Sequence, residues 1–141
     1  MKSKGTAGAV LLITLGLLII LIPNILLPVC TGRLALLNGG AVPMKCHYTA
    51  VAEIIPGIVV MVCGFLRLLF ARGKAGVAVY IVAAVCGMLV ILLATVIIGV
   101  CPGQGMACRV GSQPGLLLAG AFTIIVGGGS ALLQIRNTRR E

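Results

Sequence analysis

Four long apolar segments constrain the fold of this chain more than any other feature of its sequence. A helix needs about 20 apolar residues to cross the hydrocarbon of a bilayer. Lipid offers backbone groups no hydrogen-bond partner, so such segments must be helical, and these lack the polar–apolar alternation of a β-barrel. We predict an all-α membrane protein, a four-transmembrane-helix bundle built from two tandem helical hairpins. It forms a single domain over residues 1–141, with spans at about 7–27, 48–70, 77–100 and 115–135.

The composition supports lipid rather than water as the main solvent. Hydrophobic residues make up 60% of the chain and charged residues only 9%, whereas a soluble domain carries roughly 25% charged residues. So little charge is not enough to cover the surface of a water-soluble fold. The formal net charge of +9 would indicate nucleic acid in a soluble protein, but here it is explained by membrane topology, and no nucleic-acid partner is expected.

Basic residues are distributed unevenly between the two sides that these spans define. Eight of the 11 basic residues lie on the side of both termini: Lys2, Lys4, Arg67, Arg72, Lys74, Arg136, Arg139 and Arg140. The other three lie on the opposite side: Arg33, Lys45 and Arg109. Basic residues stay on the cytoplasmic side of a membrane. We therefore expect a multi-pass protein with both termini in the cytoplasm and a basic C-terminal end that contacts anionic lipid.

The two halves of the chain share a series of elements, which favours an internal repeat. Each half has a span, a cysteine, a short loop, a Met-x-Cys-basic motif and a Pro-Gly pair at the following helix. In order, these are Cys30, Met44-Lys45-Cys46-His47 and Pro56-Gly57 in the first half, and Cys101, Met106-Ala107-Cys108-Arg109 and Pro114-Gly115 in the second. Both hairpins start on the same side, so the halves would be related by an axis along the membrane normal.

Two loop signatures carry a resemblance to a known family. The segments 44–53 (MKCHYTAVAE) and 106–115 (MACRVGSQPG) resemble those of a family of small four-span bacterial membrane proteins of unknown function. The resemblance covers nearly the whole chain. It implies the bacterial plasma (inner) membrane, and it implies an accessory role beside ABC-transporter subunits, because genes of such proteins often lie beside ABC-transporter genes. It supplies no activity and no catalytic residues.

Four cysteines lie in the segments expected outside the cell: Cys30, Cys46, Cys101 and Cys108. Extracytoplasmic cysteines usually form disulfides, and the natural pairing is within each loop, although four cysteines allow three connectivities. Two alternatives remain open. The basic neighbours would support thiol exchange, and a soft metal ion such as copper or zinc would suit the set Met44, Cys46, His47, Met106 and Cys108.

Glu53 is the only acidic residue besides Glu141, and it falls about two turns into the second span. An ionised carboxylate at that depth costs several kcal/mol unless it is paired, hydrated or protonated. Small residues follow it at helical spacing, so the side chain should face the bundle. We expect a candidate functional site at Glu53, His47 and Arg109, which would be a proton or cation site open to the outside. The alternative is a structural role, in which Glu53 pairs with one of the nearby basic groups or is protonated and bonds across helices.

Chemistry is otherwise sparse, because none of the familiar catalytic motifs is present and one histidine with two acids supplies little for acid–base catalysis. We expect no enzymatic activity and no cofactor. The leading hypothesis is an accessory or structural component of a larger membrane assembly such as an ABC-type transporter, with self-association also possible through small-residue pairs. The alternative is an extracytoplasmic thiol-redox or soft-metal binding membrane protein.

Overall fold

Four helical rods account for nearly all of the structure, a computed structural model that describes residues 2–27, 33–35, 37–43, 45–69, 74–100, 105 and 108–140. The elements are, in order, helix α1 (Lys2–Leu21), π-helical turn η1 (Ile22–Leu26), strands β1 (Arg33–Ala35) and β2 (Ala41–Pro43), helices α2 (Lys45–Ala52), α3 (Ile54–Leu69) and α4 (Lys74–Leu92), π-helical turns η2 (Leu93–Ile97) and η3 (Cys108–Ser112), and helix α5 (Gln113–Arg140).

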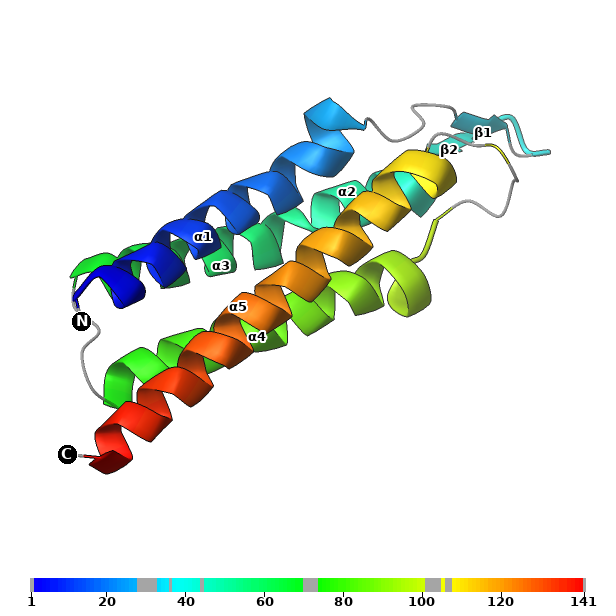
Figure 1. Ribbon diagram of the computed structural model, residues 1–141. Helices are drawn as coiled ribbons and strands as arrows, with labels where there is room; N and C mark the ends of the chain where they lie inside the picture. Colours follow the sequence, from blue (N-terminus) through cyan, green and yellow to red (C-terminus); the bar gives the residue numbers. More distant parts are fainter. Residues whose placement is uncertain are drawn as a thin grey trace.

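The predicted all-α four-helix bundle is confirmed. Four helices are long and apolar enough to cross a membrane: Thr6–Leu26, Lys45–Leu69, Ala75–Ile97 and Cys108–Arg139. The first rod is α1 with η1, the second α2 with α3, the third α4 with η2, and the fourth η3 with α5. Both chain termini lie at one end of the bundle, called here the terminal end, and the strands lie at the opposite end, called here the loop end (Figure 1).

A small β-hairpin at the loop end was not predicted from the sequence, which indicated only a loop there. Strands β1 and β2 pair antiparallel, with Arg33 opposite Pro43 and Ala35 opposite Ala41. Gly39 in the connecting turn has a φ of +77°, a left-handed conformation that glycine adopts without steric cost. The hairpin is too short to alter the fold class, and it projects beyond the helices at the loop end (Figure 1).

Glycine contacts bring the two helices of each sequence hairpin together, α1 against α3 and α4 against α5 (Figure 1). A Cβ atom added to Gly16 of α1 would lie 2.7 Å from the backbone oxygen of Gly57 in α3, and one added to Gly87 of α4 would lie 2.8 Å from that of Gly120 in α5. No larger residue fits at such backbone separations. Gly87 thus contributes to packing within the chain, and so does Gly127, whose Cβ would lie 2.8 Å from the backbone oxygen of Tyr80.

The contacts of the second hairpin repeat those of the first position by position. Positions that make matching contacts are separated by one constant number of residues between the first helices of the two hairpins, and by another constant number between the second helices. The pairs are Ala9 and Tyr80, Ile13 and Ala84, Gly16 and Gly87, Ile20 and Ile91, Gly57 and Gly120, and Gly64 and Gly127. Gly115 instead faces Ile22 and Leu27, so it does not play the part of Gly57 as the two Pro-Gly pairs had indicated. We call positions related by these offsets equivalent positions.

The first helix of each hairpin widens into a π-helical turn at equivalent positions, η1 and η2. The side-chain amide of Asn24 donates to the carbonyl of Ile20 at 2.8 Å, and the hydroxyl of Thr95 donates to that of Ile91 at 2.6 Å. The first of these turns contains Pro23, and proline removes a helical donor. The second π-helical turn contains no proline, so proline alone does not account for the pair.

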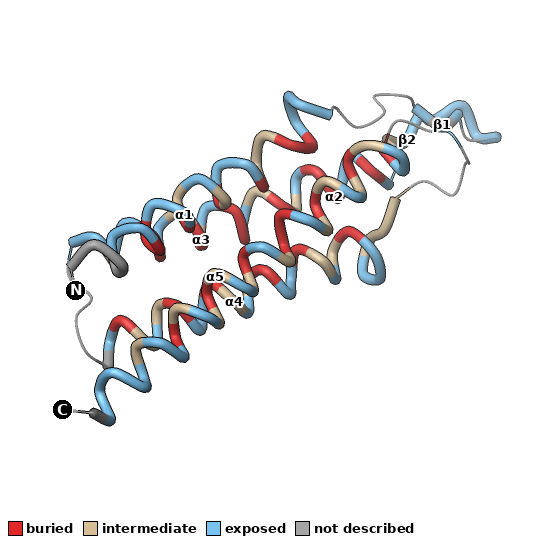
Figure 2. The backbone as a smooth tube through the Cα atoms, in the orientation of Figure 1, coloured by how far each residue is buried: buried red, intermediate tan, exposed pale blue. Residues whose placement is uncertain are grey.

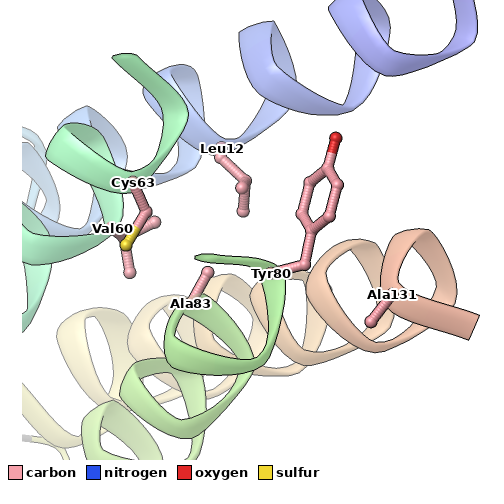
Figure 3. Close-up of a cluster of buried hydrophobic side chains, with 6 residues drawn as sticks. All are labelled: Leu12, Val60, Cys63, Tyr80, Ala83 and Ala131. Atoms are coloured by element: carbon pink, nitrogen blue, oxygen red, sulfur yellow. The ribbon is translucent and has the colours of Figure 1, made fainter. Parts of the chain in front are cut away.

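Buried residues lie along the facing sides of the rods, and exposed residues cover the outside (Figure 2). One core cluster contains Leu12, Val60, Cys63, Tyr80, Ala83 and Ala131 (Figure 3); a second lies nearer the loop end and contains Ile19, Ile22, Val90, Ala94, Leu116 and Ala119. Large apolar side chains are also exposed along the outside, among them Leu118 at 61%, Ile125 at 65% and Leu132 at 62%. Contiguous exposure of this kind is suited to lipid.

Candidate functional site

Glu53 occupies the point where α2 gives way to α3, and its side chain is fully buried. Its amide donates to the carbonyl of Thr49 at 3.0 Å, and its carbonyl accepts from the amide of Gly57 at 3.1 Å, so the rod continues through this residue. Pro56 has no N–H, so the carbonyl of Ala52 loses its regular helical donor. A proline three residues after the acid therefore explains the local irregularity of the helix.

The carboxylate of Glu53 has no hydrogen-bond partner at either oxygen. His47 and Arg109, the partners expected from the sequence, are exposed and are not bonded to it. The ring of His47 instead lies edge-on to Tyr48, with 6.1 Å between ring centroids. The predicted inward orientation of Glu53 thus matches its burial, but the structure does not bring the three predicted residues together through hydrogen bonds.

Two of the four loop cysteines are described, and both are fully buried. Cys46 lies in the first turn of α2 and Cys108 at the start of η3, so each begins the second helix of its hairpin. Cys30 and Cys101 lie outside the described residues, and both disulfides stay predictions. Burial of this kind suits a structural cysteine better than thiol exchange, which needs an accessible sulfur.

The soft-metal set is only partly described, because Met44 and Met106 lie outside the described residues. In the part of the chain that is described, no three side chains of the types His, Cys, Asp and Glu form a group that could hold a metal ion. Cys63 belongs to the first core cluster, and Cys86 packs against it. No described residue therefore adds to the metal alternative.

Two reciprocal hydrogen bonds tie the hairpins together at the loop end. The Thr49 hydroxyl, on the second rod, donates to the carbonyl of Gly99 after the third rod at 2.7 Å. The Ser112 hydroxyl, on the fourth rod, donates to the carbonyl of Leu27 after the first rod. Thr49 and Ser112 are equivalent positions, and both side chains are buried. Each hairpin therefore satisfies a carbonyl of the other where a first helix ends and leaves carbonyls without helical donors.

A second polar cluster, at the terminal end, was not predicted. The guanidinium of Arg67 donates to Oε1 of Gln134 at 3.2 Å and lies 5.3 Å from the ring centroid of Tyr80. The Tyr80 hydroxyl points toward α1 (Figure 3), where Gly8 leaves room for it. Arginine and glutamine within apolar spans were the sequence signals that would have indicated this contact between α3, α4 and α5.

Fold and site together define a class: a small multi-pass membrane protein whose four-helix bundle has one fully buried acid without a hydrogen-bond partner and, toward the opposite end, a polar cluster around Arg67. The model of a protein family described as a domain of unknown function, DUF4418, matches residues 12–133, and the chain belongs to that family. Comparison with curated proteins finds no match, and no solved structure matches the chain.

Proposed function

We propose that this protein is a non-enzymatic accessory or structural component of a larger membrane assembly such as an ABC-type transporter, in a bacterial plasma membrane with both termini in the cytoplasm. The observation that carries the proposal is a pair of glycines, Gly128 and Gly129, within α5. A Cβ atom added to either would meet nothing within 4 Å. By contrast, Gly16 and Gly87 are in tight contact with a neighbouring helix of the same chain.

Large apolar side chains flank Gly129 on one face of α5, which we call the glycine face. Leu118, Phe122, Ile125 and Leu132 are all more than half exposed, and they share the face of Gly129 because they follow one another at helical spacing. Small residues in a membrane helix let a second helix approach closely. The face therefore presents a depression between larger residues, a shape that suits an apolar transmembrane helix of a partner subunit.

The proposed orientation rests on charge. Eight of the 11 basic residues belong to the side of the termini, and Arg136 and Arg139 are exposed at the end of α5. Basic residues favour the cytoplasmic side and attract anionic lipid there. The loop end, with the β1–β2 hairpin, would then project out of the cell.

A substitution at the glycine face tests the assembly. We expect the affinity-tagged wild-type protein, expressed in its own host and solubilised in mild detergent, to migrate on a native gel with one defined partner. Gly129→Leu should abolish that complex, because the leucine fills the depression. Ala78→Leu is the matched control, since Ala78 is exposed on α4 and belongs to a different helix face. A complex that survives Gly129→Leu would refute the role of this face.

Two tags on separate copies distinguish a foreign partner from a second copy of the chain. If the differently tagged copies are recovered together and no other protein accompanies them in stoichiometric amount, the face mediates self-association and the accessory role is wrong. If the tagged protein is recovered alone, without either partner, the assembly itself is refuted.

A further inference from the structure

The most costly feature of the bundle is the carboxyl group of Glu53. Its side chain is fully enclosed, and neither oxygen has a hydrogen-bond partner. An ionised carboxylate left in this environment costs several kcal/mol, and even a neutral carboxyl loses the hydrogen bonds that water would give it. A group that costs this much and stabilises no contact within the chain points to a ligand taken from outside the chain.

The fold does not need an acid at this place. The equivalent position in the second hairpin is Leu116, which is buried to the same degree in the second core cluster. One turn beyond these two positions, Gly57 and Gly120 make matching contacts with the first helix of their hairpin. A leucine fills such a site with apolar contacts and no desolvation cost, which means that packing does not explain the glutamate.

No basic group among the described residues is hydrogen-bonded to the carboxylate. The basic residues nearest along its rod and on η3, namely Lys45, His47 and Arg109, are exposed. Arg67 on the same rod is about 21 Å away along the axis at 1.5 Å per residue, and it is engaged with Gln134 and Tyr80. The other ionisable groups in the described parts of the rods packed around it are the cysteines Cys46, Cys63, Cys86 and Cys108, the phenols of Tyr48 and Tyr80, and basic residues at the terminal end. None of them is hydrogen-bonded to the carboxylate.

The chemistry of the site selects the cation. A bare metal ion such as Ca²⁺ takes 6–8 oxygen ligands and Mg²⁺ about six, whereas Glu53 is the only acid in the described helices and belongs to no metal-binding group among them. A proton binds to a single carboxylate oxygen, and the resulting hydroxyl then needs one hydrogen-bond acceptor. The carbonyl of Ala52, the preceding residue, lacks its helical donor because of Pro56, so a carbonyl oxygen able to accept such a bond lies next to Glu53 in the chain.

We propose that Glu53 is a proton-binding site that exchanges its proton with the aqueous phase at the loop end of the bundle. Glu53 lies about 12 Å along the axis from Lys45, where the rod begins at the loop end, and about 24 Å from Leu69, where it ends. Thr49, one turn nearer the loop end, carries a hydroxyl on the same side of the rod that is held by Gly99. This site is independent of the glycine face of α5.

The test uses dicyclohexylcarbodiimide, an apolar reagent that modifies protonated carboxyls in membranes. The acid adds across one C=N bond, its proton passing to nitrogen, and the adduct rearranges to an N-acylurea that keeps the whole reagent mass. The chain has only two acidic side chains, Glu53 and Glu141, and peptide mapping separates them. In sealed membrane vesicles at neutral pH we expect labelling of Glu53, with labelling that falls as pH is raised on the loop-end side alone.

Three variants serve as controls. Glu53→Gln should abolish the adduct at this peptide. Glu53→Leu, patterned on Leu116, should remain folded, with the core thiol of Cys63 shielded from maleimide as in the parent. Leu37→Cys at the exposed hairpin turn reports which face of the vesicle carries the loop end. A folded protein that takes up no carbodiimide at Glu53 would overturn the proposal.

Four further results would also overturn it. Labelling that does not change with pH on either side of the membrane would mean that the proton on Glu53 does not exchange with the aqueous phase. Labelling that follows pH on the terminal side would place the route at the wrong end. Protection by Na⁺ or K⁺ at constant pH would mean that the ligand is a metal cation. Loss of folding in Glu53→Leu would show that the carboxyl has a structural role.

Discussion

Replacing Gly16 with alanine tests the central packing feature of the first hairpin. The added Cβ would lie 2.7 Å from both the Gly57 oxygen and the Met61 nitrogen, and 3.1 Å from the Met61 Cα. All three are backbone atoms, so no side chain can rotate away, and α1 and α3 must separate. Overpacking of this kind costs typically about 1–3 kcal/mol. Alanine favours helix over glycine by up to about 1 kcal/mol in water, which opposes the loss and must be subtracted.

In protein purified free of any partner, Gly129→Ala supplies that correction, because a Cβ there meets nothing within 4 Å in the chain and reports only the helix preference. We expect the free energy of unfolding of Gly16→Ala to lie about 1–3 kcal/mol below that of Gly129→Ala. Gly87→Ala should behave like Gly16→Ala, since its Cβ would lie 2.8 Å from the Gly120 oxygen. Equal losses in both hairpins would follow from their equivalent contacts.

The thiol of Cys63 provides the assay, because it is only 5% exposed and lies in the core between helices. Protein in mild detergent is mixed with increasing fractions of sodium dodecyl sulfate, pulsed with a maleimide and digested, and the Cys63 peptide is quantified. The midpoint and slope give the free energy of unfolding. If Gly16→Ala and Gly129→Ala unfold with the same free energy, the backbones of α1 and α3 do not approach as closely as the structure has them.

Three further changes test other contacts. Thr49→Val and Ser112→Ala each remove one bond between the hairpins, and each should lower the free energy of unfolding by about 0.6 kcal/mol, up to about 1.7, in the same assay; an unchanged value for both would contradict the cross-hairpin bonds. Arg67→Lys should cost about 0.5–1 kcal/mol, because lysine lacks the flat guanidinium that stacks on an aromatic ring. A cysteine at Leu37 should react with an impermeant maleimide in intact cells, while one at Thr138 should react only after permeabilisation; the reverse pattern would invert the topology.

The spans were predictable because lipid imposes a simple rule on the sequence. Every backbone group must be paired within the helix, so apolar length alone located the four helices, including the second, which the structure begins at Lys45 rather than near Tyr48. The β1–β2 hairpin carries no such signal. Its strands have three residues each, too few for a periodic pattern, and its formation depends on the turn at Gly39.

Side-chain partners were less predictable than elements. The burial of Glu53 followed from helical spacing, but its lack of partners depends on where His47 points, and sequence spacing does not fix rotation of an exposed ring beside Tyr48. The contact of Arg67 with Gln134 joins residues far apart in the chain. Such a contact depends on which helices are neighbours, and the order of spans along the chain leaves that open.

A near-repeated scaffold separates the residues that the fold requires from those that it merely tolerates. Where both hairpins place a glycine at equivalent positions, as at Gly16 and Gly87, backbone contact demands it. Where one hairpin has Glu53 and the other Leu116, or one has Arg67 and the other Ser130, the same packing accepts either. Both charged residues at positions where the two hairpins differ lie on α3 or at its start, one toward each end of the bundle. The second rod therefore carries the two charged residues, Glu53 and Arg67, that the fold does not require. Functional assays should vary these two residues first.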